Sequence, residues 1–139
     1  MPLQQAPTDK VCLSMDQLAP LSASSTLLLT SHADRTVSLW DARESTSIIS
    51  LSFPAAHASQ VPVVRAHPTN SNGFLTAGHD GAIKVWDVRS PKQALLGVQR
   101  QAPTKANEGK EKLLGGDWDG KLVAVGGESC ELEVYQGNL

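Results

Sequence analysis

Histidine, hydroxyl and aspartate side chains occur in this chain in a combination that can perform nucleophilic catalysis. His57 and Asp80 are the most suggestive pair, with hydroxyl side chains between them. In a Ser-His-Asp triad the carboxylate orients the imidazole, which takes a proton from the nucleophile. The chain has no Gly-x-Ser-x-Gly elbow to present such a nucleophile. We therefore expect no catalytic residues and interpret His57 and Asp80 as a structural hydrogen-bonding pair.

The remaining histidines and the two cysteines are the residue types that bind metals. His32 and His79 fall in turns of a repeated pattern and His67 precedes a proline, so we expect all three to face solvent without a shared geometry. Cys12 and Cys130 are far apart and form no Cys-x-x-Cys pair, which argues against a zinc site or a disulfide framework. Both lie in strand-like segments, where we expect small buried core residues. We expect no metal and no cofactor.

Composition excludes further classes of protein. The chain has 139 residues, of which 40% are hydrophobic and 19% charged, so it is globular rather than disordered. Its net charge of −2 gives no general attraction to nucleic acid or acidic membranes. The glycine pairs at 115–116 and 126–127 lack the Lys and Ser/Thr that follow in a phosphate-binding loop. No signal peptide or membrane-length apolar run is present, and we expect a soluble intracellular protein in a reducing compartment.

Two segments of the chain repeat one pattern at a fixed distance. Residues 34–41 (DRTVSLWD) and 80–87 (DGAIKVWD) each place an aspartate six residues before a Trp-Asp pair. Trp40 and Trp86 are 46 residues apart, which is about the length of one four-stranded propeller blade. A weaker copy, residues 129–136 (SCELEVYQ), ends on Tyr135, 49 residues beyond Trp86. Because one such repeat cannot bury its hydrophobic faces alone, the pattern predicts several sheets packed against one another.

Apolar, β-branched runs between turns predict an all-β fold, and no segment shows the period of a helix. Residues 1–10 form a flexible lead-in, residues 11–53 and 54–100 each contain four strand-like segments, and residues 113–139 contain three. Residues 101–112 are polar and of mixed charge, which favours a long mobile, solvated loop. We predict a partial propeller of about three blades, the last without its outer strand. Its open faces and unpaired edges predict self-association or marginal stability.

The repeated motif resembles the WD-repeat (WD40) family, whose blades end their third strand on Trp-Asp. In that family a histidine before the first strand, a Ser/Thr on the second, an aspartate in the next turn and the tryptophan form a hydrogen-bonded tetrad. The matching residues of the second repeat are His57, Thr76, Asp80 and Trp86. The first repeat keeps Thr30, Asp34 and Trp40, and the third has Val125, Ser129 and Tyr135 in their places. Since one such bond adds only about 1 kcal/mol net, the tetrad would act mainly by specifying a single packing of the blade.

The order of several further segments is similar to the C-terminal part of a eukaryotic family of WD-repeat ribosome-biogenesis proteins, the Ytm/WDR type. These segments include residues 40–43 (WDAR), 48–53 (IISLSF), 87–92 (DVRSPK) and 124–128 (AVGGE). The resemblance implies a non-catalytic scaffold in the maturation of the large (60S) ribosomal subunit and its rRNA. It implies partners of the Pescadillo and Bop types, association with the pre-ribosomal particle, and a location in the nucleolus and nucleoplasm. Members of the family also carry an N-terminal ubiquitin-like domain, which has no counterpart in these residues.

Other interpretations remain open at this stage. WD-repeat adaptors and substrate receptors of ubiquitin ligases or chromatin complexes use the same blades, so such an adaptor is the alternative function. Arg43 and Arg89 follow the two Trp-Asp pairs at equivalent positions. They either pair with Asp41 and Asp87 or face an acidic partner or RNA.

Overall fold

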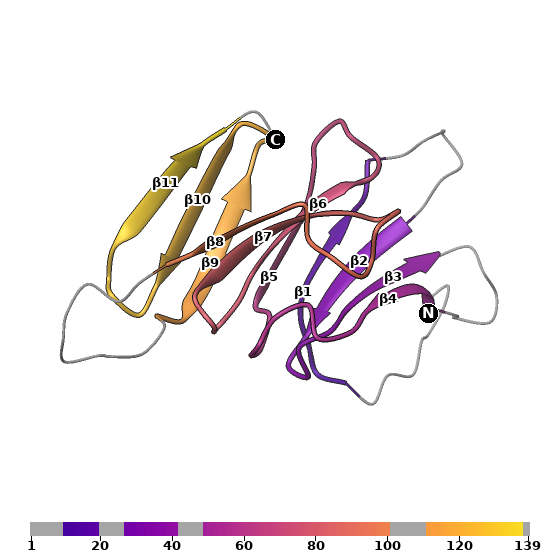
Figure 1. The fold of residues 1–139 in the computed structure, drawn as a ribbon, viewed down its shortest axis with the longest axis horizontal. Helices are drawn as coiled ribbons and strands as arrows, with labels where there is room; N and C mark the ends of the chain where they lie inside the picture. Colours follow the sequence, from indigo (N-terminus) through magenta and orange to yellow (C-terminus); the bar gives the residue numbers. More distant parts are fainter. Residues whose placement is uncertain (1–9, 20–26, 42–48, 101–110, 138–139) are drawn as a thin grey trace, which may run out of the picture.

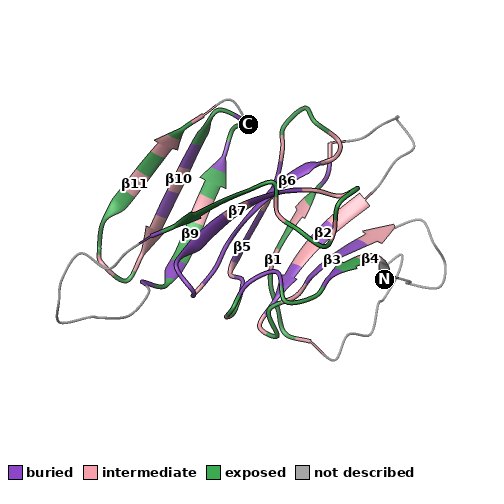
Figure 2. Ribbon diagram, viewed as in Figure 1, coloured by how far each residue is buried: buried purple, intermediate pink, exposed green. Residues whose placement is uncertain are grey.

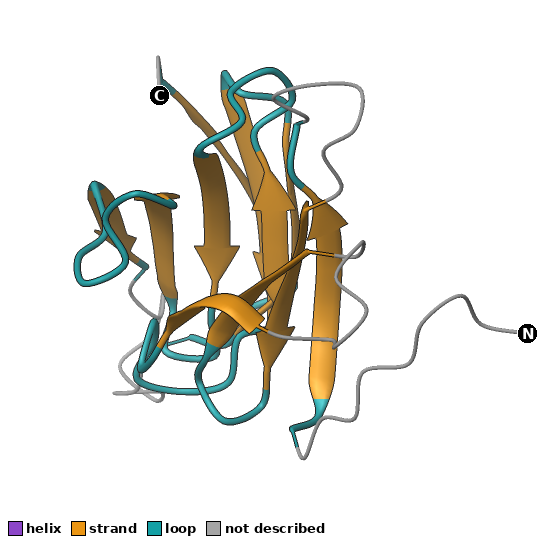
Figure 3. Cartoon of the chain, turned by 90° about the vertical axis from the view of Figure 1, so that its right-hand side faces the viewer, coloured by secondary structure: helices purple, strands orange, loops and turns teal. Residues whose placement is uncertain are grey.

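The structure is a computed structural model, and it describes residues 10–19, 27–41, 49–100 and 111–137. Within these ranges every regular element is a β-strand, and Figure 3 shows only strands joined by loops. The expected all-β class is confirmed. No helix in the described ranges is long and apolar enough to cross a membrane.

The described strands form three sheets that follow one another along the chain (Figure 1). Blade 1 contains β1 (Cys12–Gln17), β2 (Leu27–His32), β3 (Val37–Asp41) and β4 (Ile49–Phe53). Blade 2 contains β5 (Val63–Ala66), β6 (Gly73–Ala77), β7 (Ala82–Asp87) and β8 (Leu96–Gln99). Blade 3 contains β9 (Leu113–Trp118), β10 (Leu122–Gly127) and β11 (Leu132–Gln136).

Each blade is an antiparallel meander in which every strand pairs with the next one in sequence. The second and third strands keep the same register in all three blades. The equivalent backbone pairs are Thr30 with Ser38, Thr76 with Lys84, and Val125 with Glu133. The sequence repeat is therefore also a repeat of the hydrogen-bonding pattern. This arrangement is that of a partial β-propeller.

An aromatic cluster joins blades 1 and 2. Phe53 of β4 lies edge-to-face with Phe74 of β6, at a ring-centroid distance of 5.0 Å, and with Trp86 of β7, at 5.7 Å. Phe74 and Trp86 stack at 6.1 Å. All three rings are buried, together with Leu29 and Val37 of blade 1. Rings in such geometries attract one another beyond the effect of burying apolar area.

A second core packs blade 2 against blade 3. Leu75 and Val85 of blade 2 share it with Leu113, Val123 and Val125 of blade 3. Figure 2 shows the buried strand β7 in the middle of the molecule, whereas β8 and much of β11 are exposed. Each blade therefore buries its apolar face against a neighbouring blade, as the repeat predicts.

The first strands of the blades lie side by side, with β5 in contact with both β1 and β9. Arg65 of β5 links to both neighbours. Its Nη1 donates to Ser14 Oγ at 3.3 Å, and its Nε lies 3.4 Å from Asp117 Oδ1. The backbone N–H of Ala66 also donates to Asp16 Oδ2 at 2.8 Å. These polar links connect the inner edges of all three blades.

The two cysteines depart from expectation. Cys12 and Cys130 are both exposed, so the prediction that they are buried core residues is wrong. Cys12 begins β1, most of whose residues are exposed. Cys130 lies in the β10–β11 turn with a φ of 64°, where the chain reverses at the surface. A strand-like pattern identifies the segment but not which of its faces is covered.

Replacing Phe53 with alanine is expected to lower the free energy of unfolding by about 3–5 kcal/mol, because the variant leaves a cavity between two blades. Chemical denaturation followed by tryptophan fluorescence measures this loss. Leu95→Ala is the control, because Leu95 is exposed and its truncation is expected to change stability by no more than about 0.5 kcal/mol. Similar losses in the two variants would contradict the role of Phe53.

Candidate functional site

Four side chains from blade 2 and the loop before it converge in the interior. His57 lies in the loop between β4 and β5, Thr76 on β6 and Trp86 on β7. Asp80 lies in the β6–β7 turn, where the next residue, Gly81, has a φ of 74° that favours glycine. All four side chains are buried. The antiparallel pairing of β6 with β7 brings Thr76 and Trp86 together although they are ten residues apart.

These four side chains form one continuous chain of hydrogen bonds. The two oxygens of the Asp80 carboxylate lie 3.0 and 3.1 Å from His57 Nδ1. Because an ionised carboxylate only accepts, the imidazole proton lies on Nδ1. His57 Nε2 then accepts the Thr76 hydroxyl proton over 2.6 Å, and the Trp86 indole N–H donates to the same hydroxyl oxygen at 2.9 Å. Every ring nitrogen and the hydroxyl therefore have a partner away from solvent.

The Asp80 carboxylate carries the charge that orders this series of hydrogen bonds. It also accepts the backbone N–H groups of Ala58, at 2.9 Å, and Ala82, at 3.0 Å. Burial alone would raise the pKa of the Asp80 carboxyl, but the hydrogen bonds from His57, Ala58 and Ala82 outweigh it and hold this pKa far below its ordinary value. The ionised Asp80 carboxylate therefore stabilises the folded chain at neutral pH, and this contribution is lost as the pH falls below about 4.

Gly78, which the sequence interpretation missed, makes room for the imidazole. A Cβ atom at this position would lie 2.6 Å from both Asp80 Oδ1 and His57 Nδ1. Contacts that short require the hydrogen-bonded groups themselves to move, so the site requires glycine here. Aligning the repeats reveals the signal: Gly78 stands two residues before Asp80, where blade 1 has His32 two residues before Asp34.

Blade 1 uses that equivalent position in a different way. His32 is only 1% exposed, so the expectation that it faces solvent is wrong. Its Nε2 lies 2.9 Å from Thr30 Oγ1, and the same oxygen accepts the Trp40 indole N–H at 2.7 Å. His32 therefore makes, within its own strand, the contact to a threonine hydroxyl that His57 makes in blade 2. The signal in the sequence is a histidine where the next repeat has glycine.

Asp34 does not join this set of bonds. Its carboxylate accepts the Thr36 hydroxyl at 2.6 Å and the Thr36 backbone N–H at 3.2 Å, and it lies 3.1 Å from Lys10 Nζ. Without a carboxylate bonded to its ring, His32 has its pKa lowered by burial, with Asp34 opposing the shift and Lys10 adding to it. The structure thus brings together Thr30 and Trp40 of the first repeat, while Asp34 turns to other partners.

Blade 3 fills the corresponding space with Glu111. A Cβ atom at Gly127, two residues before Ser129, would lie 2.2 Å from the Lys112 carbonyl oxygen and 3.3 Å from Glu111 Oε1. The Glu111 carboxylate accepts the Ser129 backbone N–H at 2.8 Å. Glu111 is buried, so the expectation of a fully solvated loop over 101–112 is wrong at this residue. Residues 101–110 of that loop lie outside the described ranges.

Arg100 holds this acidic group in place. Its Nε lies 3.1 Å from Glu111 Oε2 and 2.8 Å from Glu133 Oε1, and its Nη2 lies 3.8 Å from Glu131 Oε2. Burial opposes ionisation of Glu111, but hydrogen bonding from Ser129 and the charge of Arg100 hold its pKa below the usual value. Three carboxylates around one guanidinium leave this end of blade 3 with a negative charge.

The arginines considered as partner contacts have different outcomes. Arg89 is exposed, and its Nε and Nη2 donate to the Asp87 carboxylate at 2.9 and 2.6 Å. This is the local pairing that the sequence left open as one of two interpretations. Exposed ion pairs of this kind add little stability. Separating Arg89 from Asp87, so that the guanidinium can contact a partner, would therefore cost little free energy. Arg43 lies outside the described residues.

The other two histidines are partly exposed. The His67 ring lies edge-on to Trp118 of blade 3 at a centroid distance of 4.9 Å, and its Nδ1 accepts the backbone N–H of Asn70 at 2.9 Å. His67 therefore shapes the β5–β6 loop and touches the next blade instead of simply facing solvent. His79 lies in the β6–β7 turn, where its backbone N–H donates to the Gln60 carbonyl at 2.9 Å.

The chain of bonds in blade 2 is suited to holding the blade in one arrangement. His57 and Thr76 are at most 1% exposed, so neither the imidazole nor the hydroxyl is open to a substrate. Both imidazole nitrogens already have partners. Across the described ranges, no three His, Cys, Asp or Glu side chains are grouped as metal ligands.

Comparison with protein families identifies the repeats. A family model described as WD40: WD domain, G-beta repeat, matches residues 4–41 and 46–87, which is more than half of the chain. Both matches end at the aspartate of a Trp-Asp pair, Asp41 or Asp87.

Several individual proteins are similar over most of the chain. Ribosome biogenesis protein YTM1 of Laccaria bicolor is 38% identical over 102 residues, covering 72% of this chain and 21% of that protein. The protein of the same name from Scheffersomyces stipitis is 32% identical over 117 residues, covering 82% and 25%. Ribosome biogenesis protein WDR12 homolog of Ixodes scapularis is 29% identical over 110 residues, covering 78% and 24%. The resemblance noted in the sequence is confirmed, and the chain spans about a quarter of the length of these relatives.

Replacing Gly78 with alanine is expected to lower the free energy of unfolding by about 1–3 kcal/mol, because the added methyl group collides with the His57–Asp80 pair. Gly97→Ala is the matched control, since the nearest atom to its Cβ would lie 3.8 Å away. Urea denaturation of both variants measures the difference. An unchanged stability for Gly78→Ala would contradict the tight seat of the imidazole.

Stability is expected to decline as the pH falls below about 6.5, because His32 binds a proton more readily in the unfolded chain than in its buried folded site. His32→Gln keeps a side-chain amide near Thr30 and should flatten this decline by up to about 1.4 kcal/mol per pH unit. Thermal or urea unfolding between pH 5 and pH 7.5 measures the slope. His79→Gln is the control, and an equal flattening in both variants would contradict the assignment to His32.

Proposed function

We propose, since this chain belongs to the WD-domain, G-beta repeat family, that it acts as a non-catalytic scaffold in ribosome biogenesis. Its role is in the assembly of the large (60S) subunit and the maturation of its rRNA. It acts there through protein–protein contacts rather than through chemistry on a substrate.

The observation that carries this proposal is the repeated similarity to proteins named for ribosome biogenesis. The three relatives align over 102–117 residues at 29–38% identity. These alignments are longer than the two segments matched by the general WD-repeat model. Because WD blades serve many functions, the fold alone would not favour one. Similarity along most of the chain supports this particular assembly role.

The geometry of blade 2 supports the non-catalytic part of the proposal. The residue types that could relay a proton are bonded to one another and closed to solvent. A relay needs an accessible nucleophile beside its base. Here Thr76 instead accepts the indole proton of Trp86, which ties two strands of the blade together.

We extend the proposal to partners of the Pescadillo and Bop types within a pre-ribosomal particle, and to a location in the nucleolus and nucleoplasm. This part rests on the family resemblance. On the described surface, Arg89 is the exposed basic group that we select to test for contact with an acidic partner surface or RNA.

Affinity purification of the tagged chain from nuclear extract is expected to recover Pescadillo-type and Bop-type proteins together with large-subunit precursors. Arg89→Glu is expected to reduce this recovery several-fold, by about the effect of reversing one interfacial charge. Lys92→Glu, in the same exposed turn, is the matched control. Recovery of neither partner would contradict the proposal, and recovery of ubiquitin-ligase or chromatin subunits instead would favour the adaptor alternative.

A further inference from the structure

The turn between β7 and β8 presents a serine hydroxyl that takes no part in the fold. Ser90 is exposed, and within the described part of the molecule its hydroxyl has no hydrogen-bond partner. Its backbone N–H donates to the Asp87 carbonyl at 2.9 Å, which closes the first half of the turn. The hydroxyl can therefore be modified without the loss of a contact.

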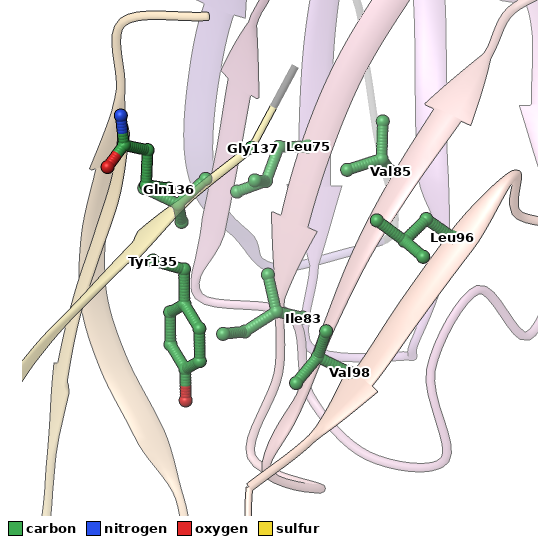
Figure 4. Close-up of a pocket in the computed structure, with 9 residues that line it drawn as sticks. Leu75, Ile83, Val85, Leu96, Val98, Tyr135, Gln136 and Gly137 are labelled. Atoms are coloured by element: carbon green, nitrogen blue, oxygen red, sulfur yellow. The ribbon is translucent and has the colours of Figure 1, made fainter. Parts of the chain in front are cut away.

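The segment that contains Ser90 is fixed to the protein at both ends. Val88 and Ala94 pack against the apolar core between blades 1 and 2. Beyond Ala94 the chain enters β8, where Leu96 and Val98 line the apolar groove between blades 2 and 3 (Figure 4). Residues 89–93 lie between these anchors and are mostly exposed. The turn thus extends from a complete four-stranded blade that packs against a described blade on each side.

The second half of the turn is held by few hydrogen bonds. Pro91 has no N–H to donate, and residues 92–94 form no hydrogen bond with the described residues. The next bond along the backbone is from Leu95 N–H to the Val85 carbonyl, at 2.8 Å. This half can therefore straighten without breaking the sheet, because segments with few contacts open at low free energy.

The residue that follows Ser90 selects a class of modifying enzyme. Ser90-Pro91 is the only Ser-Pro or Thr-Pro pair in the 139 residues. A residue before proline favours the extended backbone, which is the form in which protein kinases bind the residues around a target hydroxyl. Kinases of the proline-directed class require proline at the next position, where no backbone N–H is left unpaired in the complex.

We propose that Ser90 is a phosphorylation site for a proline-directed protein kinase. ATP supplies the phosphoryl group. A bond forms between Ser90 Oγ and the γ-phosphorus, the bond from that phosphorus to the bridging oxygen of ADP breaks, and the hydroxyl proton passes to the catalytic base of the kinase. The modified side chain carries a charge of about −1.5 to −2 at neutral pH.

The phosphate reverses the charge of this turn. Residues 87–92 contain one aspartate against one arginine and one lysine, so their net charge changes from +1 to roughly −1. The ion pair between Arg89 and Asp87 is exposed on the arginine side and weak. A phosphate can accept two hydrogen bonds from one guanidinium. We therefore expect Arg89 to leave Asp87 and pair with the phosphate.

The regulatory consequence rests on the proposed function, in which Arg89 is tested for contact with an acidic partner surface or RNA. A phosphate on the next residue occupies that guanidinium and repels the same acidic surface. Phosphorylation of Ser90 is therefore expected to weaken the contacts of this chain within its assembly.

The site is tested by incubating the full 139-residue chain with ATP and a cyclin-dependent kinase and locating the phosphate by mass spectrometry. We expect one phosphate, on Ser90, added within about tenfold of the rate for a peptide of residues 85–95, because the turn opens easily. Ser90→Ala and Pro91→Ala should each abolish it. Ser90→Thr should retain it, since Thr-Pro meets the same requirement, and thermal unfolding checks that each variant folds.

The movement of Arg89 is tested by phosphorus NMR of the modified chain at varied pH. The second pKa of phosphoserine is about 6, and it should fall here because the guanidinium favours the doubly charged phosphate. Arg89→Gln should return this pKa to about 6. Lys112→Gln is the control, because Lys112 precedes Leu113, which bonds to Gly78 at the opposite end of β6 from the turn, and it should leave the pKa unchanged.

The effect on assembly is tested by repeating the affinity purification from nuclear extract with the phosphorylated chain and phosphatase inhibitors. Recovery of partners should fall several-fold relative to the unmodified chain, as for Arg89→Glu. Equal recovery of partners by both forms would overturn the regulatory role. Modification of the 85–95 peptide without modification of the folded chain would overturn the site itself. If the unmodified chain recovers no partner, the scaffold function fails, whereas phosphate located on Ser90 still supports the site.

Discussion

The packing of blade 2 depends on hydrogen bonds between the polar groups that it buries beside the turn between its second and third strands. In blade 2 the carboxylate of Asp80 orders the imidazole of His57, which binds Thr76 and through it Trp86. A buried donor or acceptor without a partner costs roughly 1–3 kcal/mol, so this set is stable only when complete. The same Trp86 belongs to the aromatic cluster with Phe53 and Phe74. The hydrogen bonds within blade 2 are thus coupled to its contact with blade 1.

The three blades place different residues in this equivalent space. Blade 2 has Gly78 to admit an imidazole from the preceding loop, and blade 1 has His32 at that position to supply its own imidazole. Blade 3 has Gly127, which admits the Lys112 carbonyl group with the Glu111 carboxylate beside it, and Arg100 lies next to that carboxylate. The turn itself keeps a left-handed residue in each blade, namely Arg35, Gly81 and Cys130. Backbone geometry is therefore conserved between the repeats more strictly than side-chain chemistry.

The contrast between internally bonded polar side chains and exposed charged turns and strand edges suits a protein that works through contacts with other proteins. Side chains capable of acid–base chemistry are used internally, and the exposed features are charged turns, strand edges and the groove between blades 2 and 3. Neighbouring blades are held together by the aromatic cluster and the second apolar core, and Arg65 adds polar links to residues on β1 and β9.

The sequence by itself determined the all-β class and the three repeats, because the Trp-Asp pattern and its spacing are local and periodic, whereas the residues of the blade 2 tetrad were implied by the resemblance to the WD-repeat family. It did not determine which face of a strand is covered, and so the burial of His32 and Glu111 and the exposure of Cys12 and Cys130 were decided only by the tertiary structure. The reason is physical: whether an imidazole or a carboxylate is buried depends on the space and partners that other segments provide. Gly78 and His32 occupy equivalent positions of the aligned repeats, but the tertiary structure decides that Gly78 makes room for an imidazole and that His32 supplies one.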